Sequence, residues 1–373
     1  MSDINHKSII KIGKYKDLSI KGIDNELVSG LYRFMLLLRM CQEELIKEYH
    51  PADEIRCPVH FCVGQEAMPA ALSFLISKND FLFSHHRSHG YFLAKGGSLK
   101  SLFAELYGRQ TGANAGKAGS QEISIPSVKF YSGAIVAGML AIAVGAGLGI
   151  QLKGKTEVAV AVFGDAAADE GAFWEAISYA KLRELPVLFI CENNSYSTYS
   201  HQLKRQPADN IHARVAAFGL ETRALFGNDV ITNYLTLKEA FSHLHKGKGP
   251  FFIEAYTYRF RGHVGPEDDD YIGYRPKSEL EFWKNNCPIL LLEEQMVALG
   301  LLTAQRKKEI VNEIENEIVE AFKFAKNSPF PAEPNWEKLN WAQESPVADK
   351  LLHDGPQSEI FDQNQKDTIP QPY

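Results

Sequence analysis

The stretch Gly164-Asp165-Ala166-Ala167-Ala168-Asp169-Glu170-Gly171, with Asn194 29 residues after Asp165, decides the fold of this chain. Two apolar runs and one stretch with a helical pattern flank these polar residues, at 157–163, 185–193 and 172–184 respectively. The order strand, loop, helix, strand is typical of a parallel sheet, in which successive strands end at the same edge. We therefore expect the Asp165 and Asn194 side chains to lie together at the carboxyl edge of such a sheet.

A carboxylate and a carboxamide at one sheet edge have the chemistry of a site for a hard cation. Such a cation takes oxygen ligands, and when it holds a diphosphate it needs only one carboxylate and one or two neutral oxygens from the protein. The phosphate and water supply the remaining ligands. On these residues alone, the alternative is an Asp that caps a helix and an Asn in a turn of some other α/β protein.

The composition is that of an ordinary globular protein. The 373 residues suffice for two average domains or for one large α/β domain. The net charge of -6 and the lack of a long basic block give no support for nucleic-acid binding. The five cysteines include no Cys-x-x-Cys pair and residues 1–22 have no leader-type apolar core, so we expect reduced thiols and a cytoplasmic location.

One uncharged segment, residues 133–150, has nearly the length of a membrane span. Small residues recur in it at every fourth position, at Ala137, Ala141, Gly145 and Gly149. This spacing makes one face of a helix almost flat, so that another backbone can approach it closely. We expect a helix in the core or at a subunit contact rather than a membrane span, because no second candidate span accompanies it.

The order of the elements predicts one large domain between two less regular ends. Residues 1–24 are predicted to be an N-terminal arm, 25–343 an α/β domain with C-terminal helices, and 344–373 a polar tail. The regular alternation of strands and helices favours a doubly wound, mainly parallel sheet. Within the domain we expect a first helix at 25–49, a late strand at 251–256, a loop at 261–275, and helices from 278 and at 304–326.

The run His85-His86-Arg87-Ser88-His89-Gly90 places three imidazoles and a guanidinium within five residues. The guanidinium of Arg87 is suited to a bidentate contact with a phosphate. The imidazole of His89 is able to orient or protonate a substrate. The alternative for this run is a surface loop or the first turn of a helix.

These motifs together resemble the alpha subunits of thiamine-diphosphate-dependent 2-oxo acid dehydrogenases of the pyruvate or acetoin type. The spacing from Asp165 to Asn194 is similar to the Gly-Asp-Gly…Asn-Asn signature of thiamine-diphosphate enzymes, and residues 86–90 resemble the Tyr-Arg-x-His-Gly motif of the alpha subunits. Further stretches match the family in the same order, at 64–67, 106–109, 116–120, 134–137 and 257–263. The resemblance implies the α/β fold that binds thiamine diphosphate.

The resemblance also implies roles for individual residues. Asp165, Asn194 and the main-chain carbonyl of Tyr196 would bind Mg²⁺. Thiamine diphosphate would contact these three residues and also His86, Arg87, Ala134, Val136, Ala166, Ala167 and His263. His263 and His89 are the candidate catalytic residues, with His263 at the reacting centre and His89 at the substrate pocket.

The implied function is that of the decarboxylating component of a dehydrogenase complex. This alpha subunit would cleave a 2-oxo acid or acetoin and pass the acyl group to a lipoyl carrier on an acyltransferase. A glutamate that activates the cofactor comes from a separate beta subunit in the family, so we expect an α₂β₂ heterotetramer and no activity from this chain alone. The alternatives are non-oxidative acyl transfer (carboligation) and a degenerate subunit without catalysis.

Three departures from the family pattern lie near the expected site. Ala166 stands in place of the second Gly of Gly-Asp-Gly, and Glu122 in place of a histidine near the pocket. The family's Gly-Ile-Val-Gly is Ala134-Ile135-Val136-Ala137 here. A methyl group against a phosphate oxygen weakens binding, so these changes decide between a working site and a degenerate one. The acidic run 267–270 is expected to be a solvated loop, with a lid or a partner contact as alternatives.

Overall fold

A computed structural model describes residues 18–50 and 54–332 of the chain. Within these residues a seven-stranded sheet runs in the order β2-β3-β1-β4-β5-β9-β8. Neighbouring strands are parallel except β2 and β3, which are antiparallel. The strands are β1 (Phe81–Ser84), β2 (Ser124–Ile125), β3 (Phe130–Ser132), β4 (Ala159–Gly164), β5 (Val187–Asn193), β8 (Glu221–Phe226) and β9 (Phe251–Tyr256), and a separate hairpin pairs β6 (Tyr196–Ser197) with β7 (Ser200–His201).

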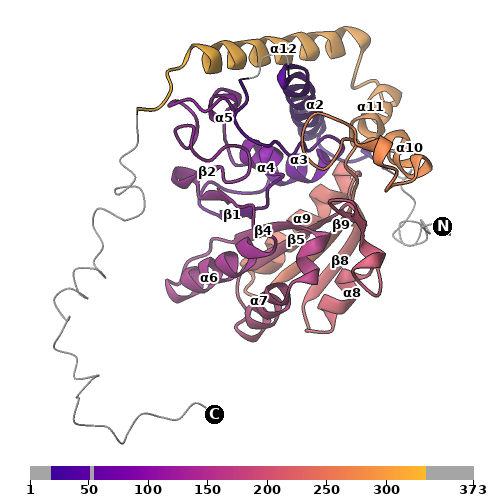
Figure 1. The fold of residues 1–373 in the computed structure, drawn as a ribbon. Coiled ribbons are helices and arrows are strands. Elements are labelled where there is room, and N and C mark those ends of the chain that lie inside the picture. Colours follow the sequence, from indigo (N-terminus) through magenta and orange to yellow (C-terminus); the bar gives the residue numbers. More distant parts are fainter. Residues whose placement is uncertain (1–17, 51–53, 333–373) are drawn as a thin grey trace, which may run out of the picture. The chain divides into compact units, whose positions relative to one another are not determined.

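Helices cover both faces of the sheet, as predicted for a doubly wound fold (Figure 1). The helices α6, α7 and α8 cover one face, and α2, α3 and α9 contribute to the core on the other. Their bounds, with those of the remaining helices, are α2 (Asn25–Glu48), α3 (Ala67–Ser73), α4 (His89–Ala94), α5 (Leu99–Leu106), α6 (Gly138–Leu152), α7 (Gly171–Leu182), α8 (Ile211–Ala216), α9 (Val230–His245), α10 (Lys277–Asn285), α11 (Pro288–Ala298) and α12 (Ala304–Asn327). Short 3₁₀ turns are η1 (Pro126–Val128), η2 (Asp165–Asp169), η3 (Gln202–Lys204) and η4 (Asp270–Ile272).

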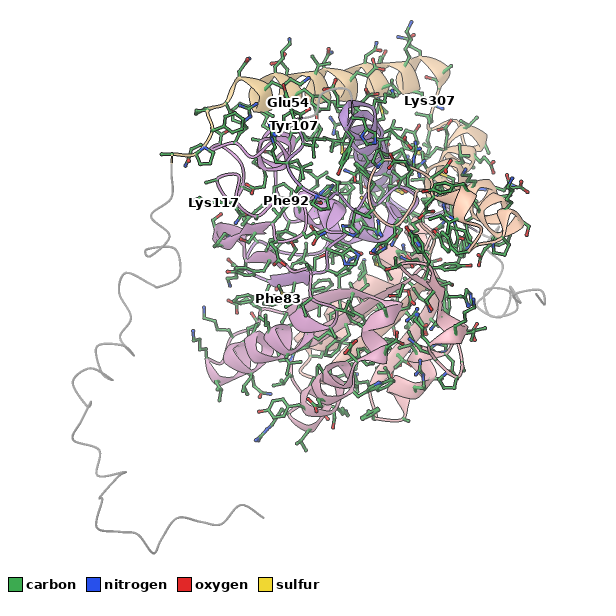
Figure 2. All side chains as sticks on the ribbon, in the orientation of Figure 1. Glu54, Phe83, Phe92, Tyr107, Lys117 and Lys307 are labelled. Atoms are coloured by element: carbon green, nitrogen blue, oxygen red, sulfur yellow. The ribbon has the colours of Figure 1, made fainter. Side chains whose placement is uncertain are left out.

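The central strands are buried on both faces, which explains their unbroken apolar sequences. Successive side chains of a strand point to opposite faces, so Phe189 of β5 packs with α6 and α7 while Leu188 and Ile190 pack in the core on the other face. Figure 2 labels rings from both cores, among them Phe83 of β1 and Phe92 of α4. These two cores fix the sheet edge from which the candidate site residues extend.

The α/β domain begins earlier in the chain than the predicted boundary at residue 25. Leu18 and Ile20, which we assigned to the arm, are buried in the main core. Among the described residues, one compact unit extends from Leu18 to Phe330, and the next begins at Pro331. The first 17 residues of the arm and the whole predicted polar tail, 344–373, lie outside the described residues.

Most of the uncharged segment forms α6, and of its four recurring small residues Ala141 and Gly145 are exposed while Ala137 is buried in the core. Gly147 faces inward, where a methyl group would come within 2.6 Å of Val187 Cγ2. Ala141 and Gly145 are exposed instead, and Ile142 beside them is 52% exposed. Of the two places we expected for this helix, the core is confirmed for the face that carries Leu140 and Val144, and a subunit contact at the exposed face stays a prediction. No helix among the described residues has the length and apolarity to cross a membrane.

The side of the sheet on which new strands are added changes at β1. After β1 it adds β3 on one side, and after α6 it returns to add β4 on the other side of β1. Ligands of doubly wound sheets bind outside the carboxyl ends of the strands at such a switch point. The loops that follow β1 and β4 begin with His85 and Asp165, so both motifs from the sequence meet at this place.

Gly64 is held in a backbone conformation that excludes any side chain. Its φ is +99°, and a methyl group there would lie 2.4 Å from the carbonyl oxygen of Tyr258. We expect Gly64→Ala to cost more than about 3 kcal/mol of unfolding free energy, since strain and overpacking add. Gly154→Ala is the matched control, because Gly154 has φ +60° with open space around it and should cost only about 1 kcal/mol. Denaturant unfolding measures both, and equal losses would contradict the close approach at Gly64.

Candidate active site

A cavity of about 230 Å³ opens at the switch point of the sheet. It is lined by residues that follow the carboxyl ends of several strands: His85 to Arg87 after β1, Ala134 to Ala137 after β3, Asp165 to Ala167 after β4, and Asn194 with Tyr196 to Thr198 after β5. His60, Gln65, Gln121 and His263 complete its polar wall. Of the sequence-predicted site residues, every one except His89 lines this cavity.

The three predicted metal ligands lie around the ends of β4 and β5. These strands pair in parallel with Gly164 opposite Glu192, so Asp165 and Asn194 follow neighbouring strand ends. The amide of Tyr196 donates a hydrogen bond of 3.2 Å to Asn194 Oδ1, which orients the carboxamide. Asp165 is buried, and burial raises the pKa of its carboxyl while Arg205 opposes the rise. A bound cation would remove this desolvation penalty.

Arg205 is a contact of the predicted metal site that the sequence did not indicate. Its guanidinium forms ion pairs with both Asp165 and Asp169. Gln206 adds hydrogen bonds from Nε2 to the Asp165 carbonyl at 2.9 Å and to Asp169 Oδ1 at 2.7 Å. The Asp165 carboxylate therefore already has one cationic partner, which a metal ion must share or replace.

Arg87 is a buried cation at the cavity wall. Its guanidinium donates hydrogen bonds to the carbonyl oxygens of Phe61 and His263. No carboxylate forms a salt bridge with it among the described residues, and burial together with the nearby Arg259 lowers its pKa to about 10. A buried guanidinium without an ion partner is costly and favours an anion in the adjacent space.

Three histidine rings meet in the cavity. The ring centroids of His60 and His86 lie 4.4 Å apart, those of His60 and His263 4.9 Å, and those of His86 and His263 5.8 Å. Burial lowers the pKa of His60 to about 2 and that of His263 to about 3, and it also lowers the pKa of His86. All three rings are therefore uncharged at neutral pH.

His89 does not reach the cavity, contrary to the role we expected for it. It is fully buried at the start of α4, where Nδ1 lies 3.1 Å from Gln42 Nε2 and Nε2 lies 2.9 Å from Ser120 Oγ. Both ring nitrogens therefore have protein partners. His89 is the first residue of α4 and is buried there, where its ring packs between Gln42 and Ser120. The structure fits a positioning role for His89 rather than contact with substrate.

The buried His89 should make the fold sensitive to acid. Burial, with Arg87, lowers its pKa from 6.5 to about 4, so the unfolded chain binds more protons than the folded chain between these values. Stability then falls as the pH drops through this window, by about 2 kcal/mol at pH 5. Comparing unfolding free energies at pH 7 and 5, His89→Gln should lose about 2 kcal/mol less than the unchanged chain. The exposed His245→Gln control should leave the pH dependence unchanged, and a similar slope for His89→Gln would refute the assignment.

Two of the departures from the family pattern touch one another. The carboxylate of Glu122 accepts a hydrogen bond of 2.8 Å from the amide of Ala134. Glu122 therefore anchors the segment that begins with Ala134 instead of facing the cavity. At the end of that segment Ala137 has φ +62°, a left-handed conformation that is strained for alanine and suits the glycine of the family pattern. Backbone strain of this kind is often found at functional sites.

The acidic run is only partly the solvated loop that we expected. Asp269 is 7% exposed, and its Oδ2 accepts a hydrogen bond of 2.9 Å from the main-chain amide of His263. Its Oδ1 accepts a hydrogen bond of 2.9 Å from Tyr274, and Arg275 lies 3.5 Å away. Asp268 and Asp270 are more exposed. The prediction was therefore wrong for Asp269, which folds the loop back on itself and fixes the His263 backbone.

Several polar residues of the cavity wall were absent from the predicted site, among them His60, Gln65 and Gln121. His60 lies four residues before Gly64, so the match at 64–67 was the signal that could have indicated it. Gln65 belongs to that match, and its amide is buried with no hydrogen-bond partner for either Nε2 or Oε1 among the described residues. Gln121 Nε2 lies 3.2 Å from His60 Nδ1. Gln121 directly follows the match at 116–120 and stands beside Glu122, but the family pattern assigned it no role.

Comparison with known proteins agrees with this geometry. The dehydrogenase E1 component family matches residues 32–333. Three similar proteins are each named pyruvate dehydrogenase E1 component subunit alpha. That of Rickettsia bellii is 31% identical over 325 residues, which cover 87% of this chain and 97% of the relative. That of Rhizobium meliloti is 32% identical over 302 residues (80% and 86%), and the human somatic, mitochondrial form is 33% identical over 312 residues (83% and 77%).

The family match spans the cavity, both cores and the C-terminal helices. It confirms the resemblance and the fold class that the motifs predicted. The family uses thiamine diphosphate together with a divalent metal, and its alpha subunits work with a beta subunit. This chain belongs to the dehydrogenase E1 component family, as an alpha subunit of the thiamine-diphosphate-dependent 2-oxo acid dehydrogenases.

Proposed function

We propose that this chain, with a beta subunit, decarboxylates pyruvate and transfers the acyl group to a lipoyl carrier. The observation that carries the proposal is the single cavity lined by Asp165, Arg87 and His263. The relatives named above support pyruvate in preference to acetoin as the substrate.

The residues of the cavity fit thiamine diphosphate and a divalent cation. The buried Arg87 guanidinium needs an anion, and a diphosphate supplies one. The amide of Gln65 has two polar atoms without partners, which a polar ligand in the cavity can satisfy. Asp165 offers a buried carboxylate beside the Asn194 carboxamide, an oxygen set that suits Mg²⁺.

The proposed roles follow the position of each group. Asp165, Asn194 and the carbonyl of Tyr196 would hold Mg²⁺, and Arg87 with His86 would hold the diphosphate. The main-chain groups of Ala134 and Val136 would contact the aminopyrimidine, with Ala166 and Ala167 beside the phosphates. When bound, thiamine diphosphate supplies the nucleophile and the electron sink. The uncharged His263 accepts or donates a hydrogen bond at the reacting centre, where its lowered pKa keeps it neutral.

The surroundings of the cavity support an assembly with other chains. Ile135 is 79% exposed and Val136 is 46% exposed at the cavity wall, although both are apolar. The face of α6 that carries Ala141 and Gly145 is also exposed. We propose that beta and alpha subunits cover these surfaces in an α₂β₂ heterotetramer. The five free cysteines support a reducing compartment, which we propose is the cytoplasm.

Calorimetric titration tests this function on the chain copurified with its beta-type partner. We expect saturable binding of thiamine diphosphate that depends on Mg²⁺, followed by decarboxylation of pyruvate and acetylation of a lipoyl domain. Turnover that needs no lipoyl acceptor would support the non-oxidative alternative instead. Absence of cofactor binding to a well-folded complex would favour the non-catalytic subunit, since Ala166 places a methyl group at the cavity wall.

A further inference from the structure

The three histidines of the cavity form a group with ligand chemistry of its own. His60, His86 and His263 each offer one ring nitrogen, and these three atoms lie within 4.8 Å of one another. The histidines come from three different segments of the chain: one before α3, one after β1 and one after β9. They are separate from the oxygen ligands proposed for Mg²⁺, which follow β4 and β5.

The arrangement of the rings is close to that of a three-histidine zinc site. With Zn–N distances near 2.0–2.1 Å, tetrahedral coordination places ligand nitrogens about 3.3 Å apart and ring centroids about 5 Å apart. The observed centroid distances of 4.4, 4.9 and 5.8 Å lie on both sides of that value. Small rotations of the side chains therefore bring the three nitrogens around one ion, and the open cavity leaves the fourth position to water.

The type of ligand in the cluster favours a metal of intermediate softness. Each of the three imidazoles offers one ring nitrogen, which binds a metal ion through the lone pair of the neutral ring. Arg87 and Arg259 oppose any cation, and the carboxylate of Glu192, which lines the same cavity, partly offsets them. Neutral nitrogen ligands suit Zn²⁺ and disfavour Mg²⁺, which prefers oxygen.

A second contact lies behind the cluster. Gln121 Nε2 is 3.2 Å from Nδ1 of His60, the nitrogen that a ligand role at Nε2 would leave free. A rotated amide would accept a hydrogen bond from Nδ1–H, as the partners of zinc-bound histidines commonly do. We infer that His60, His86 and His263 form a three-histidine site for Zn²⁺ inside the cofactor cavity.

Zinc binding at this site does not depend on the proposed function, but the inhibition of turnover that we expect from it rests on that function. Bound zinc takes the lone pairs of His263 and the space beside Arg87. Zinc and the proposed catalytic role of His263 are therefore mutually exclusive, and zinc inhibits turnover in proportion to its occupancy. The binding measurement below does not need an active enzyme, so the two proposals fail separately.

Calorimetric titration of ZnCl₂ into the full chain, freed of metal by a chelator, tests the site. We expect one zinc ion per chain, and we expect His60→Gln, His86→Tyr and His263→Gln each to weaken it by more than about 100-fold, because even an outer-shell partner contributes 10–100-fold. His245→Gln, an exposed histidine outside the cavity, and Asp165→Ala should retain zinc binding. Circular dichroism of each variant confirms that loss of binding is not loss of fold.

Cobalt supplies a second readout that distinguishes the ligands. Co²⁺ in place of zinc should give the intense visible bands of tetrahedral nitrogen coordination, and these bands should disappear in His86→Tyr. A strong thiolate charge-transfer band would assign the ion to cysteine and overturn the inference. So would zinc affinity that survives in all three histidine variants or that is lost in Asp165→Ala.

Discussion

Replacing Asp165 with alanine is expected to abolish Mg²⁺-dependent binding of thiamine diphosphate. Asp165 is the buried carboxylate of the proposed metal site, beside the neutral oxygens of Asn194 and Tyr196. Its loss leaves the cation without a charged protein ligand, so cofactor affinity should fall by roughly 100-fold or more. Calorimetry on the complex with the beta subunit measures this loss, and turnover should disappear with it.

The ion pairs of Arg205 supply a matched control for this variant. Arg205 binds both Asp165 and Asp169, but Asp169 does not line the cavity. Asp169→Asn therefore disturbs the same guanidinium without removing a metal ligand, and it should leave cofactor affinity within a few-fold. In Asp165→Ala the guanidinium keeps Asp169, so the fold should persist. Cofactor binding unchanged by Asp165→Ala would refute the metal assignment.

Replacing His263 with glutamine is expected to slow turnover by roughly 10²–10⁴-fold, the usual contribution of a positioned acid or base. Cofactor binding should change little, because the carbonyl oxygen of His263, and not its ring, accepts the hydrogen bond from Arg87. The amide of His263 likewise retains its bond to Asp269 in the variant. Steady-state turnover and cofactor titration on the same preparation separate the two effects.

A histidine outside the cavity tests whether the loop rather than the ring is responsible. His50 Nε2 lies 2.6 Å from Glu267 Oε1, on the loop that follows His263, and both side chains are largely exposed. His50→Gln removes a contact of this loop without changing the cavity, so turnover should remain near that of the unchanged enzyme. Normal turnover in His263→Gln would reduce His263 to a loop residue. Equal losses in both variants would assign the effect to loop order.

The secondary structure was predictable because its signals are local. Apolar runs predicted the strands β4, β5 and β9, and the structure places them at Ala159–Gly164, Val187–Asn193 and Phe251–Tyr256. The periodicity of apolar residues predicted α2 and α12 to within one or two residues. The positions of Asp165 and Asn194 followed from the same reasoning, since parallel strands end at one edge.

The composition of the site was less predictable, because side-chain direction depends on packing. His89 stands two residues after Arg87 in one motif, yet the first turn of α4 buries it between Gln42 and Ser120. The acidic run looked uniformly solvated, but burial of Asp269 makes it the anchor of the His263 backbone. Neither outcome follows from residue type or spacing.

The sequence by itself determined the doubly wound sheet and the residues at the ends of its strands, because both depend on the order of neighbouring elements. Only the tertiary structure decided where the switch point lies and which distant groups meet there. Arg205 reaches Asp165 across 40 residues, and Arg87 reaches the His263 carbonyl across 176. The grouping of His60 with His86 and His263 belongs to the same class of contact. Such contacts form where two cores fix the loops in space, and no local pattern encodes that distance.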